Sequence, residues 1–396
     1  MLDLLIRGGK VLLPDGQWHD LDVGIQGGRI AALERGLSLP AHRVLDIGGM
    51  LLLPGVIDLH THLRSPTGEE DFFTRETASA VAGGVTMLGD FAYPPGTRFE
   101  LDFSTKCQRL ARQSLCDFVL HTVVRRPEDL EQVQTRTVKI FFSASGLGMP
   151  ADQALVLLQH ALARGHQVLV HVEALSDWVM ILQRGLPAVS GGGLHILHVP
   201  HQRFVHLAMA LSDERVTLET CPHYLLWEWL QSQGHTEVNP PIEPADLWSE
   251  VRAGRLHTIG TDHCSYTLSE KKTLGLPGFP GLETLLPLMV SFGVLSGRLA
   301  WGDLSRLLSS GPARVLGLYP RKGAILVGSD ADLVCFDPIP DFQVDRPAYG
   351  RADFTPYRGL RVRGRVVRTW VRGREVFACG SADLTAAGWG KWQEHG

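Results

Sequence analysis

The middle of the chain alternates short apolar runs with helix-like stretches, and this alternation limits the possible folds more than any other feature. The runs are rich in β-branched residues and lie within residues 50–263, with helices predicted over residues 71–83, 152–164 and 203–213. Apolar runs separated by helices predict parallel strands covered on both faces. We count about eight such runs, the number of strands that closes a (β/α)₈ TIM barrel.

The two ends of the chain have a different pattern. Residues 1–49 contain short alternating strands separated by Gly-Gly pairs at 8–9 and 27–28, which is a hairpin signal. The C-terminal part alternates in the same way between Gly359, Gly364 and Gly373. We therefore predict a small β-sandwich built from residues 1–49 and 321–396, beside a barrel formed by residues 50–320. Two separate terminal hairpins would give the same pattern.

Charge and composition exclude several classes of protein. The 396 residues include 38 Lys and Arg against 42 Asp and Glu, a net charge of −4, so there is no basic surface for nucleic acid. No apolar run approaches the roughly 20 residues that a membrane helix needs, and the start of the chain lacks a signal-peptide pattern. None of the six cysteines forms a Cys-x-x-Cys pair. We expect a cytoplasmic protein with reduced thiols and no membrane partner.

Metal-binding residue types stand at the ends of the predicted strands. Active sites of (β/α)₈ barrels are built at the C-terminal ends of the strands. His60 and His62 are two residues apart, so both side chains face the same side of an extended strand. The other strands supply His171, His198 and Asp262. Imidazoles with a carboxylate suit zinc or a related divalent metal.

The remaining ionisable strand residue is Lys139, within the run VKIFF. An ammonium cannot bind a metal ion, and a single lysine of this kind is more often snorkelling or paired with a carboxylate. Beside the other five residues it fits only as a neutral amine or as a carbamate that bridges two cations. Six other histidines do not belong to this group of metal-binding residue types and are interpreted as structural: His121, His160, His166, His195, His206 and His257.

At these residues the chain resembles the amidohydrolase superfamily, in the branch of dihydroorotases, hydantoinases (dihydropyrimidinases) and allantoinases. PGVIDLHTHLR (54–64) carries the Asp-x-His-x-His motif, and VKIFFSASG (138–146) resembles the segment with a carboxylated lysine. Further matching segments follow in the family's order: VLVHVEA (168–174), HILHV (195–199), ETCPHYL (219–225), VNPPI (238–242), IGTDH (259–263), PGLE (280–283) and residues 311–338. The resemblance covers essentially the whole chain.

The resemblance implies two divalent metal ions, with zinc expected, and CO₂ bound as a carbamate on Lys139. One ion would be held by His60, His62, Lys139 and Asp262, and the other by His171, His198 and the same carbamate. A hydroxide between the ions would attack the carbonyl of a small cyclic amide or imide. Asp262 would act as general base and then as general acid. Relatives often assemble, so a homo-oligomer is expected.

Two residues favour a dihydroorotase-like substrate. Arg64 matches the arginine that binds the substrate carboxylate in dihydroorotases, and Asn239 matches a substrate contact there. However, Tyr266 replaces an expected histidine, and residues 91–95 replace a Met-Pro-Asn segment. Other segments look closer to hydantoinases, although Ala144 replaces their usual tyrosine.

Three alternatives therefore stand beside the dihydroorotase-like interpretation. Hydantoinase (dihydropyrimidinase) and allantoinase activity share the predicted metal ligands. A non-catalytic scaffold relative is disfavoured, because such proteins usually lack ligands and all six positions are filled here. A mononuclear deaminase is less favoured still, since it would not need Lys139.

The sequence leaves two alternatives for each of two segments near the predicted site. Only 27 residues separate His171 from His198, enough for one crossover helix, which leaves that side of the site open or covered by a partner subunit. The Gly/Pro-rich segment 275–281 is either a substrate lid or a plain surface turn.

Overall fold

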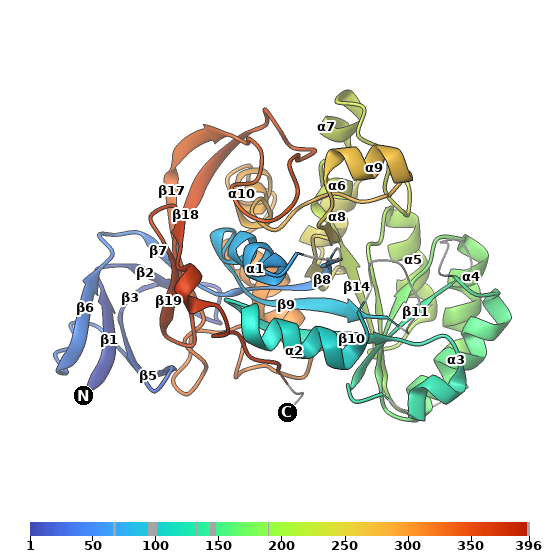
Figure 1. Cartoon of the computed structure of the whole chain (residues 1–396), viewed down its shortest axis with the longest axis horizontal. Helices are drawn as coiled ribbons and strands as arrows, with labels where there is room; N and C mark the ends of the chain where they lie inside the picture. Colours follow the sequence, from blue (N-terminus) through green and yellow to red (C-terminus); the bar gives the residue numbers. More distant parts are fainter. Residues whose placement is uncertain (66–68, 94–100, 132, 143–147, 189, 394–396) are drawn as a thin grey trace.

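The computed structural model describes residues 1–65, 69–93, 101–131, 133–142, 148–188 and 190–393. Its central element is a parallel sheet with strand order β15-β14-β13-β12-β11-β10-β9-β8-β16 (Figure 1). The two end strands, β15 (Thr258–Ile259) and β16 (His263–Cys264), are consecutive in the chain, so the sheet closes on itself. The predicted TIM barrel is confirmed. Its other strands are β8 (Val56–His62), β9 (Val85–Ala92), β10 (Asp117–Val123), β11 (Thr137–Phe141), β12 (Gln167–His171), β13 (Gly193–Ile196) and β14 (Val216–Thr220).

Helices cover the outside of this sheet, so its strands are buried on both faces. Every residue of β9 is buried, for example. The three predicted helices are confirmed to within two residues as α1 (Phe72–Ala82), α3 (Ala151–Ala163) and α5 (Gln202–Leu211). The others are α2 (Phe103–Gln113), α4 (Leu175–Met180), α6 (Pro222–Leu225), α7 (Trp227–Ser232), α8 (Leu247–Arg252), α9 (Leu268–Leu274), α10 (Leu285–Met289), α11 (Trp301–Ser305) and α12 (Gly311–Val315). No helix among the described residues is long and apolar enough to cross a membrane.

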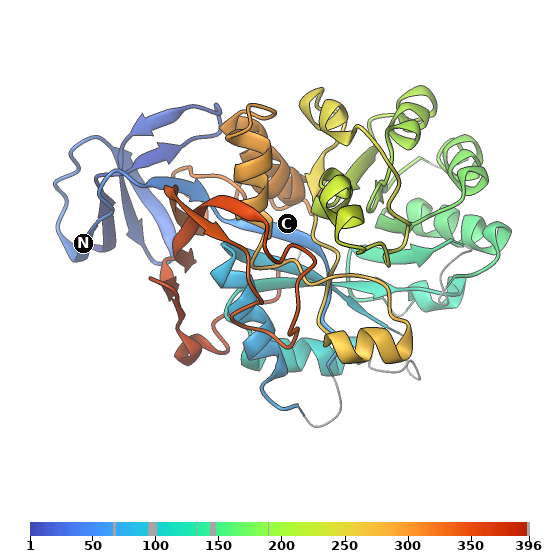
Figure 2. The ribbon, with the colours of Figure 1, turned by 90° about the horizontal axis from the view of Figure 1, so that it is seen from above.

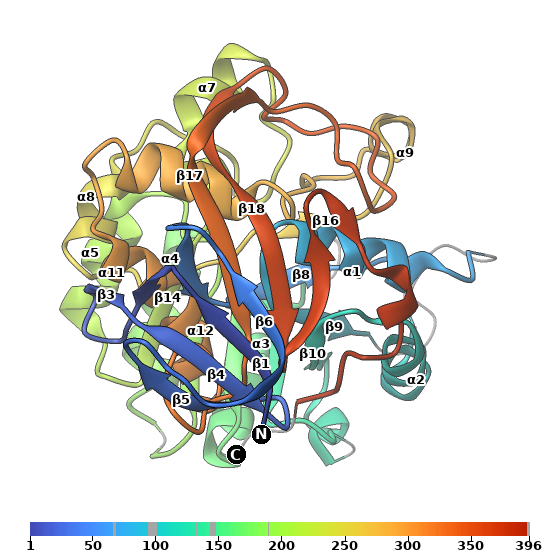
Figure 3. The ribbon, with the colours of Figure 1, turned by 90° about the vertical axis from the view of Figure 1, so that its left-hand side faces the viewer.

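Strands from both ends of the chain form two further sheets that pack together beside the barrel (Figures 2 and 3). A shared apolar cluster that includes Ile6, Val23, Leu52, Leu333 and Trp370 fills the sandwich. One sheet has the order β5 (Arg29–Glu34), β4 (Asp22–Gln26), β1 (Leu2–Arg7), β6 (Ala41–Asp46). The other has the order β20 (Ser381–Ala382), β19 (Arg374–Ala378), β18 (Arg361–Val371), β17 (Leu333–Gln343), β7 (Leu51–Pro54), β2 (Lys10–Leu12), β3 (Trp18–Asp20). Because N-terminal and C-terminal strands share this second sheet, the ends form one β-sandwich.

One of the two terminal hairpin predictions needs correction. The Gly27-Gly28 turn does connect the antiparallel pair β4–β5, but Gly8-Gly9 makes no hairpin, because β1 and β2 lie in different sheets. The run after residue 50 is two strands divided at Gly55, where an added Cβ would lie 2.1 Å from the Thr86 hydroxyl oxygen. The division into residues 1–49 with 321–396 and residues 50–320 stays a proposal.

A buried ionic cluster links the barrel to the sandwich. The Lys322 ammonium lies 2.5 Å from Asp117 at the start of β10, and 3.0 and 2.7 Å from Asp330 and Asp332 just before β17. Arg372 also pairs with Asp117. The three carboxylates are close enough together to hold a metal ion. Since the lysine already lies among them, we interpret the cluster as a structural link.

Lys322→Met should lower the free energy of unfolding by about 3–5 kcal/mol, because buried carboxylates would lose their main counter-ion. Urea denaturation of the purified variant measures this loss. The matched control is Lys10→Met, whose pair with Asp20 is about half exposed (50% and 53%) and is expected to contribute under about 1 kcal/mol. Equal losses for the two variants would contradict the interpretation of the cluster.

Candidate metal centre

One cavity of about 330 Å³ at the C-terminal ends of the barrel strands contains every residue that the sequence predicted for the site. Its walls are completed by Tyr93, Phe141, Cys264 and the segment Leu276, Pro277 and Gly278. The predicted residues that line it are His60, His62, Arg64, Lys139, His171, His198, Asn239 and Asp262. The structure thus brings together predicted side chains from five strands or strand ends and from the segment at residue 239.

His60, His62 and Asp262 form the tightest group. One ligand atom from each lies within 4.8 Å of the others. Asp262 Oδ1 is 3.2 Å from His60 Nε2 and 3.0 Å from His62 Nε2. Strand β8 directs both histidines inward, as their spacing predicted. The aspartate lies in the short turn between β15 and β16.

His171 and His198 form a second group beside the first. Their ring centroids are 4.5 Å apart, and the His198 ring is 5.2 Å from that of His60. His198 and Asp262 have positive φ angles of 42° and 51°, which non-glycine residues seldom adopt. Such backbone costs about 1–3 kcal/mol and clusters at functional sites. Its occurrence at two of the predicted ligands supports a functional role for this rim.

Lys139 is fully buried between the two groups. Its Nζ lies 4.7 Å from the ring centre of Phe141 and 5.2 Å from that of Phe91, and it has no hydrogen-bond partner among the described residues. Burial lowers the pKa of Lys139 to about 7, although Asp262 and Glu219 act in the opposite direction. Near pH 7 a substantial fraction of the amine is therefore in the neutral form that reacts with CO₂.

This lowered pKa predicts how stability of the metal-free protein depends on pH. The folded pKa of about 7 is below the ordinary 10.5, so the unfolded chain binds more protons between these values. The resulting destabilisation is complete below pH 7 and disappears as the pH rises to about 10.5. After chelator treatment, Lys139→Met should therefore melt above the wild type at pH 7, with the gap closing toward pH 10. A gap that does not change with pH would argue against a neutral buried amine.

Four further ligand candidates, His62, His171, His198 and Asp262, have the protonation states that metal ions require. Burial lowers the pKa of His62 to about 3, and it also lowers the pKa values of His171 and His198. Burial opposes ionisation of Asp262, but the nearby His60 and His62 hold its pKa well below the usual range. Neutral imidazoles thus face an ionised carboxylate. Together with the unpartnered Lys139 Nζ and His198 Nδ1, this donor set fits divalent metal ions.

Glu219 is a functional candidate that sequence analysis did not single out. It is the second-last residue of β14, is fully buried, and accepts a 2.8 Å hydrogen bond from His60 Nδ1. Burial raises the pKa of Glu219, but contacts with His195 and His60 outweigh it and lower the pKa to about 2. A carboxylate behind a histidine fixes its tautomer and leaves Nε2 available for the metal. The available signal was an acidic residue at the end of the buried run RVTLET.

Contacts with neighbouring side chains and backbone also orient His171, His62 and the turn that carries Asp262. His171 Nε2 lies 2.8 Å from Glu173 Oε1, and His62 Nδ1 lies 3.3 Å from the Tyr93 hydroxyl. Buried Asp58 accepts hydrogen bonds from the backbone N–H and the hydroxyl of Thr261, at 3.1 and 2.5 Å. The first motif residue, Asp58, therefore holds the turn that carries Asp262.

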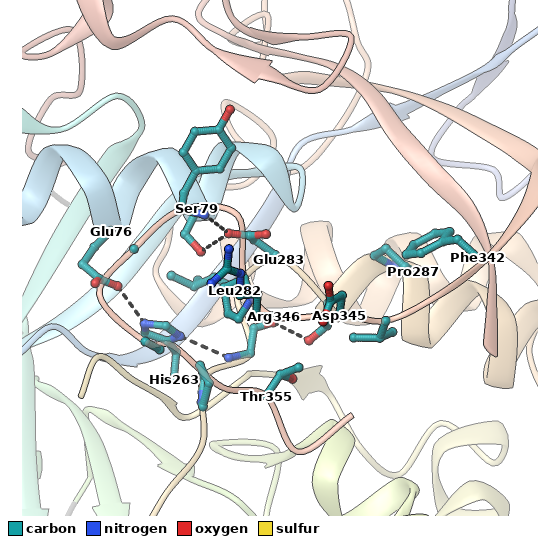
Figure 4. A pocket seen from close by; sticks show the side chains of 18 residues that line it. Glu76, Ser79, His263, Leu282, Glu283, Pro287, Phe342, Asp345, Arg346 and Thr355 are labelled. Carbon is teal, nitrogen blue, oxygen red and sulfur yellow. Dashed lines mark hydrogen bonds and ion pairs between the residues drawn. The ribbon is translucent and has the colours of Figure 1, made fainter. Parts of the chain in front are cut away.

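His263, the neighbour of Asp262, faces away from the cavity toward α1. Its Nδ1 accepts a 3.1 Å hydrogen bond from the Gly281 N–H, so its Nε2 carries the proton and donates to Glu76 Oε2 at 3.0 Å (Figure 4). Glu76 also accepts from the backbone N–H of Arg351 in the loop between β17 and β18. This chain of contacts ties the last barrel strand to α1 and to the sandwich.

The segment 275–281 forms one wall of the cavity. Lys271 Nζ donates to the carbonyls of Glu237, Leu276 and Gly278, each at 3.0 Å. Tyr266, which stands where the resemblance to dihydroorotases implies a histidine, donates its hydroxyl to the Pro277 carbonyl. Its polar atom thus supports the wall. Ala144 and residues 94–95 lie outside the described residues.

Comparison with known proteins agrees with this geometry. The sequence model described as Amidohydrolase family matches residues 51–376. The chain belongs to the amidohydrolase family. It is 32% identical to an allantoinase of Deinococcus radiodurans over 98% of each chain, and 29% identical to a D-hydantoinase of Ralstonia pickettii over 96% of each. Its fold matches the crystal structure of dihydropyrimidinase from Brevibacillus agri NCHU1002, with a TM-score of 0.85 and 26% identity over 100% and 99% of the two chains.

These relatives confirm the predicted branch of the family. The protein is a cyclic amide hydrolase, and the non-catalytic scaffold alternative is correspondingly disfavoured. The names of the relatives support the hydantoinase, dihydropyrimidinase and allantoinase alternative better than the dihydroorotase-like interpretation.

Proposed function

We propose that this amidohydrolase hydrolyses a neutral ring amide of the hydantoin, dihydropyrimidine or allantoin type at a centre of two divalent metal ions. The observation that carries the proposal is the convergence of four histidines, one aspartate and one unpartnered lysine on a single cavity. The names of the relatives support the choice of ring class.

Each proposed ligand follows from the groups described above. His60, His62 and Asp262 would hold one ion, and His171 with His198 would hold the other. Lys139 lies between the groups and, as a carbamate, would contribute an oxygen to each ion. Zinc is the expected metal for this set of nitrogen and oxygen donors. When bound, the ions polarise the ring carbonyl and lower the pKa of water toward neutrality.

Asp262 is the proposed proton carrier. Its carboxylate is ionised at neutral pH and lines the cavity, close to His60 and His62. It can therefore accept the proton of the attacking water and deliver it to the ring nitrogen that leaves. Phe141, Leu276 and Pro277 form an apolar part of the cavity wall and limit the access of other water molecules.

A substrate panel tests the ring class. Purified protein loaded with zinc and bicarbonate would be assayed with hydantoin, dihydrouracil, allantoin and dihydroorotate. We expect the highest kcat/KM for one of the three neutral rings. A preference for dihydroorotate would favour the dihydroorotase-like interpretation instead, and no turnover of any ring would contradict the proposed function.

A dihydroorotase-like substrate is the second candidate. Arg64 supports it, because this arginine lines the same cavity as Asn239. A guanidinium that pairs with a substrate carboxylate contributes roughly a 10- to 100-fold effect. We expect Arg64→Met to lower kcat/KM for dihydroorotate by that factor and to change the value for dihydrouracil little. An unchanged ratio between the two substrates would remove the argument for a carboxylate contact.

We also propose a homo-oligomer. Between β12 and β13 the described residues form α4 and a following π-helical turn at Ile181–Gly185, so the predicted single crossover helix is present. A partner subunit could cover this side of the site. Sedimentation analysis that finds only monomer would contradict the proposal.

A further inference from the structure

A second cavity, of about 570 Å³, lies at the opposite end of the barrel. It is lined by Gln167 and Gly193, the first residues of β12 and β13, and by His257 directly before β15. The proposed metal ligands stand at the other ends of these parallel strands. The cavity is therefore separate from the catalytic centre.

Arginines dominate the lining of this cavity. Arg136, Arg215, Arg306 and Arg314 line it, against a single carboxylate, Glu214, among its described lining residues. We call it the arginine cavity. Its cationic side chains outnumber its carboxylates, and this imbalance distinguishes it from an ordinary solvated surface, where charges of both signs alternate.

Only part of this positive charge is neutralised by the protein. Arg215 pairs with Asp213 at 2.6 Å, and Arg306 Nη2 is 4.0 Å from Asp303. Within the described residues, Arg136 and Arg314 have no carboxylate at ion-pair distance. Gathering guanidinium groups without counter-ions is unfavourable, because like charges repel.

Several of these cations are nevertheless held in place. The Arg314 guanidinium lies 3.7 Å from the centre of the Tyr319 ring, and Arg306 Nη1 donates to the Leu256 carbonyl at 3.0 Å. Arg306 Nη2 is a buried atom without a hydrogen-bond acceptor among the described residues, and burial lowers the pKa of this guanidinium. Guanidinium N–H groups that are held in place but lack an acceptor in the protein can donate to a bound ligand.

His257 adds a further donor of the same kind. Its Nδ1 accepts a 3.0 Å hydrogen bond from the Leu218 N–H, so its Nε2 carries the proton. That Nε2 has no hydrogen-bond partner among the described residues. The arginine cavity thus combines four guanidinium groups with an imidazole N–H.

We propose that the arginine cavity binds a small multivalent oxyanion of the phosphate class. Guanidinium groups bind phosphate oxygens through paired, charge-assisted hydrogen bonds. The described lining residues include no Phe, Tyr or Trp on which a nucleobase could stack, so the anion itself is the recognised group. The volume falls within the usual range of ligand sites, roughly 300–1,000 Å³. This inference does not depend on the proposed ring hydrolysis.

The test is calorimetric titration of the metal-loaded protein with inorganic phosphate in a low-chloride buffer. We expect saturable binding at one site per chain. Arg136→Gln combined with Arg314→Gln should weaken it by at least about tenfold, because both charge-assisted contacts are lost. Glu214→Gln should strengthen it, because the opposing carboxylate is removed. The expected increase in phosphate affinity for Glu214→Gln tests the proposal even if the Arg136/Arg314 double variant folds poorly.

Two matched controls locate the bound phosphate. Arg64→Gln removes the arginine of the metal cavity, and Arg35→Gln removes an arginine whose side chain is 79% exposed. Both should bind phosphate like the wild type. Absence of saturable binding at millimolar phosphate, unchanged affinity in a folded Arg136/Arg314 double variant, or loss of binding with Arg64→Gln would each overturn the proposal.

Discussion

Lys139→Met is expected to abolish ring hydrolysis and to remove bound metal at the same time. The lysine lies between both groups of histidines, so the loss of its carbamate would weaken the binding of two ions. We expect kcat to fall by at least about a thousandfold, since the metal ions provide several kcal/mol of transition-state stabilisation. Steady-state kinetics with metal analysis on the same sample measures both effects.

Chemical rescue separates the carbamate from a general structural role. Acetate or propionate can supply a carboxylate in the space left by Lys139→Met, and should restore part of the activity and of the metal content. Larger acids should not fit the enclosed site. A Lys139→Met protein that keeps its metal and most of its activity would show that the lysine is not a ligand.

Asp262→Asn is expected to have the second largest effect. Asparagine keeps the shape and one oxygen of the aspartate, but it cannot accept and return a proton. The loss of general acid–base catalysis should lower kcat by about 10²–10⁴-fold. The loss should be smaller for a ring whose leaving nitrogen is more acidic, because that nitrogen needs less protonation.

Glu219→Gln provides the comparison for Asp262→Asn. Glu219 contacts His60 and would not itself hold a metal ion, so its replacement should cost only about 10–100-fold. If Asp262→Asn reduced kcat no more than Glu219→Gln, Asp262 would not be the proton carrier.

The convergence of the proposed metal ligands was predictable because two local rules place them. Residues two apart on a strand share a face, which brings His60 and His62 together, and parallel strands end at one rim, which adds His171, His198 and Asp262. The rule of the common rim also applies to Glu219 near the end of β14, but no local rule pairs Glu219 with His60 or His263 with Glu76. Glu219 meets His60 across 159 positions of sequence and His263 meets Glu76 across 187, so only the folded chain reveals the contacts.

The terminal strands show the same limit. Gly27-Gly28 connects strands that pair with each other, so the local signal was sufficient. Gly8-Gly9 carries the same signal, but β1 pairs with β4 and β6 while β2 pairs with β3 and β7. Both strands bury apolar residues in the sandwich, but β1 joins one of its two sheets and β2 joins the other. Strand alternation alone could not assign them.

The central claim is a centre of two metal ions that depends on Lys139, and metal content per chain tests it most directly. Wild-type protein supplied with zinc and bicarbonate, then freed of loosely bound ions, should retain about two ions per chain. Lys139→Met prepared in parallel should retain clearly fewer. Less than one ion per wild-type chain under these conditions would contradict the proposed centre.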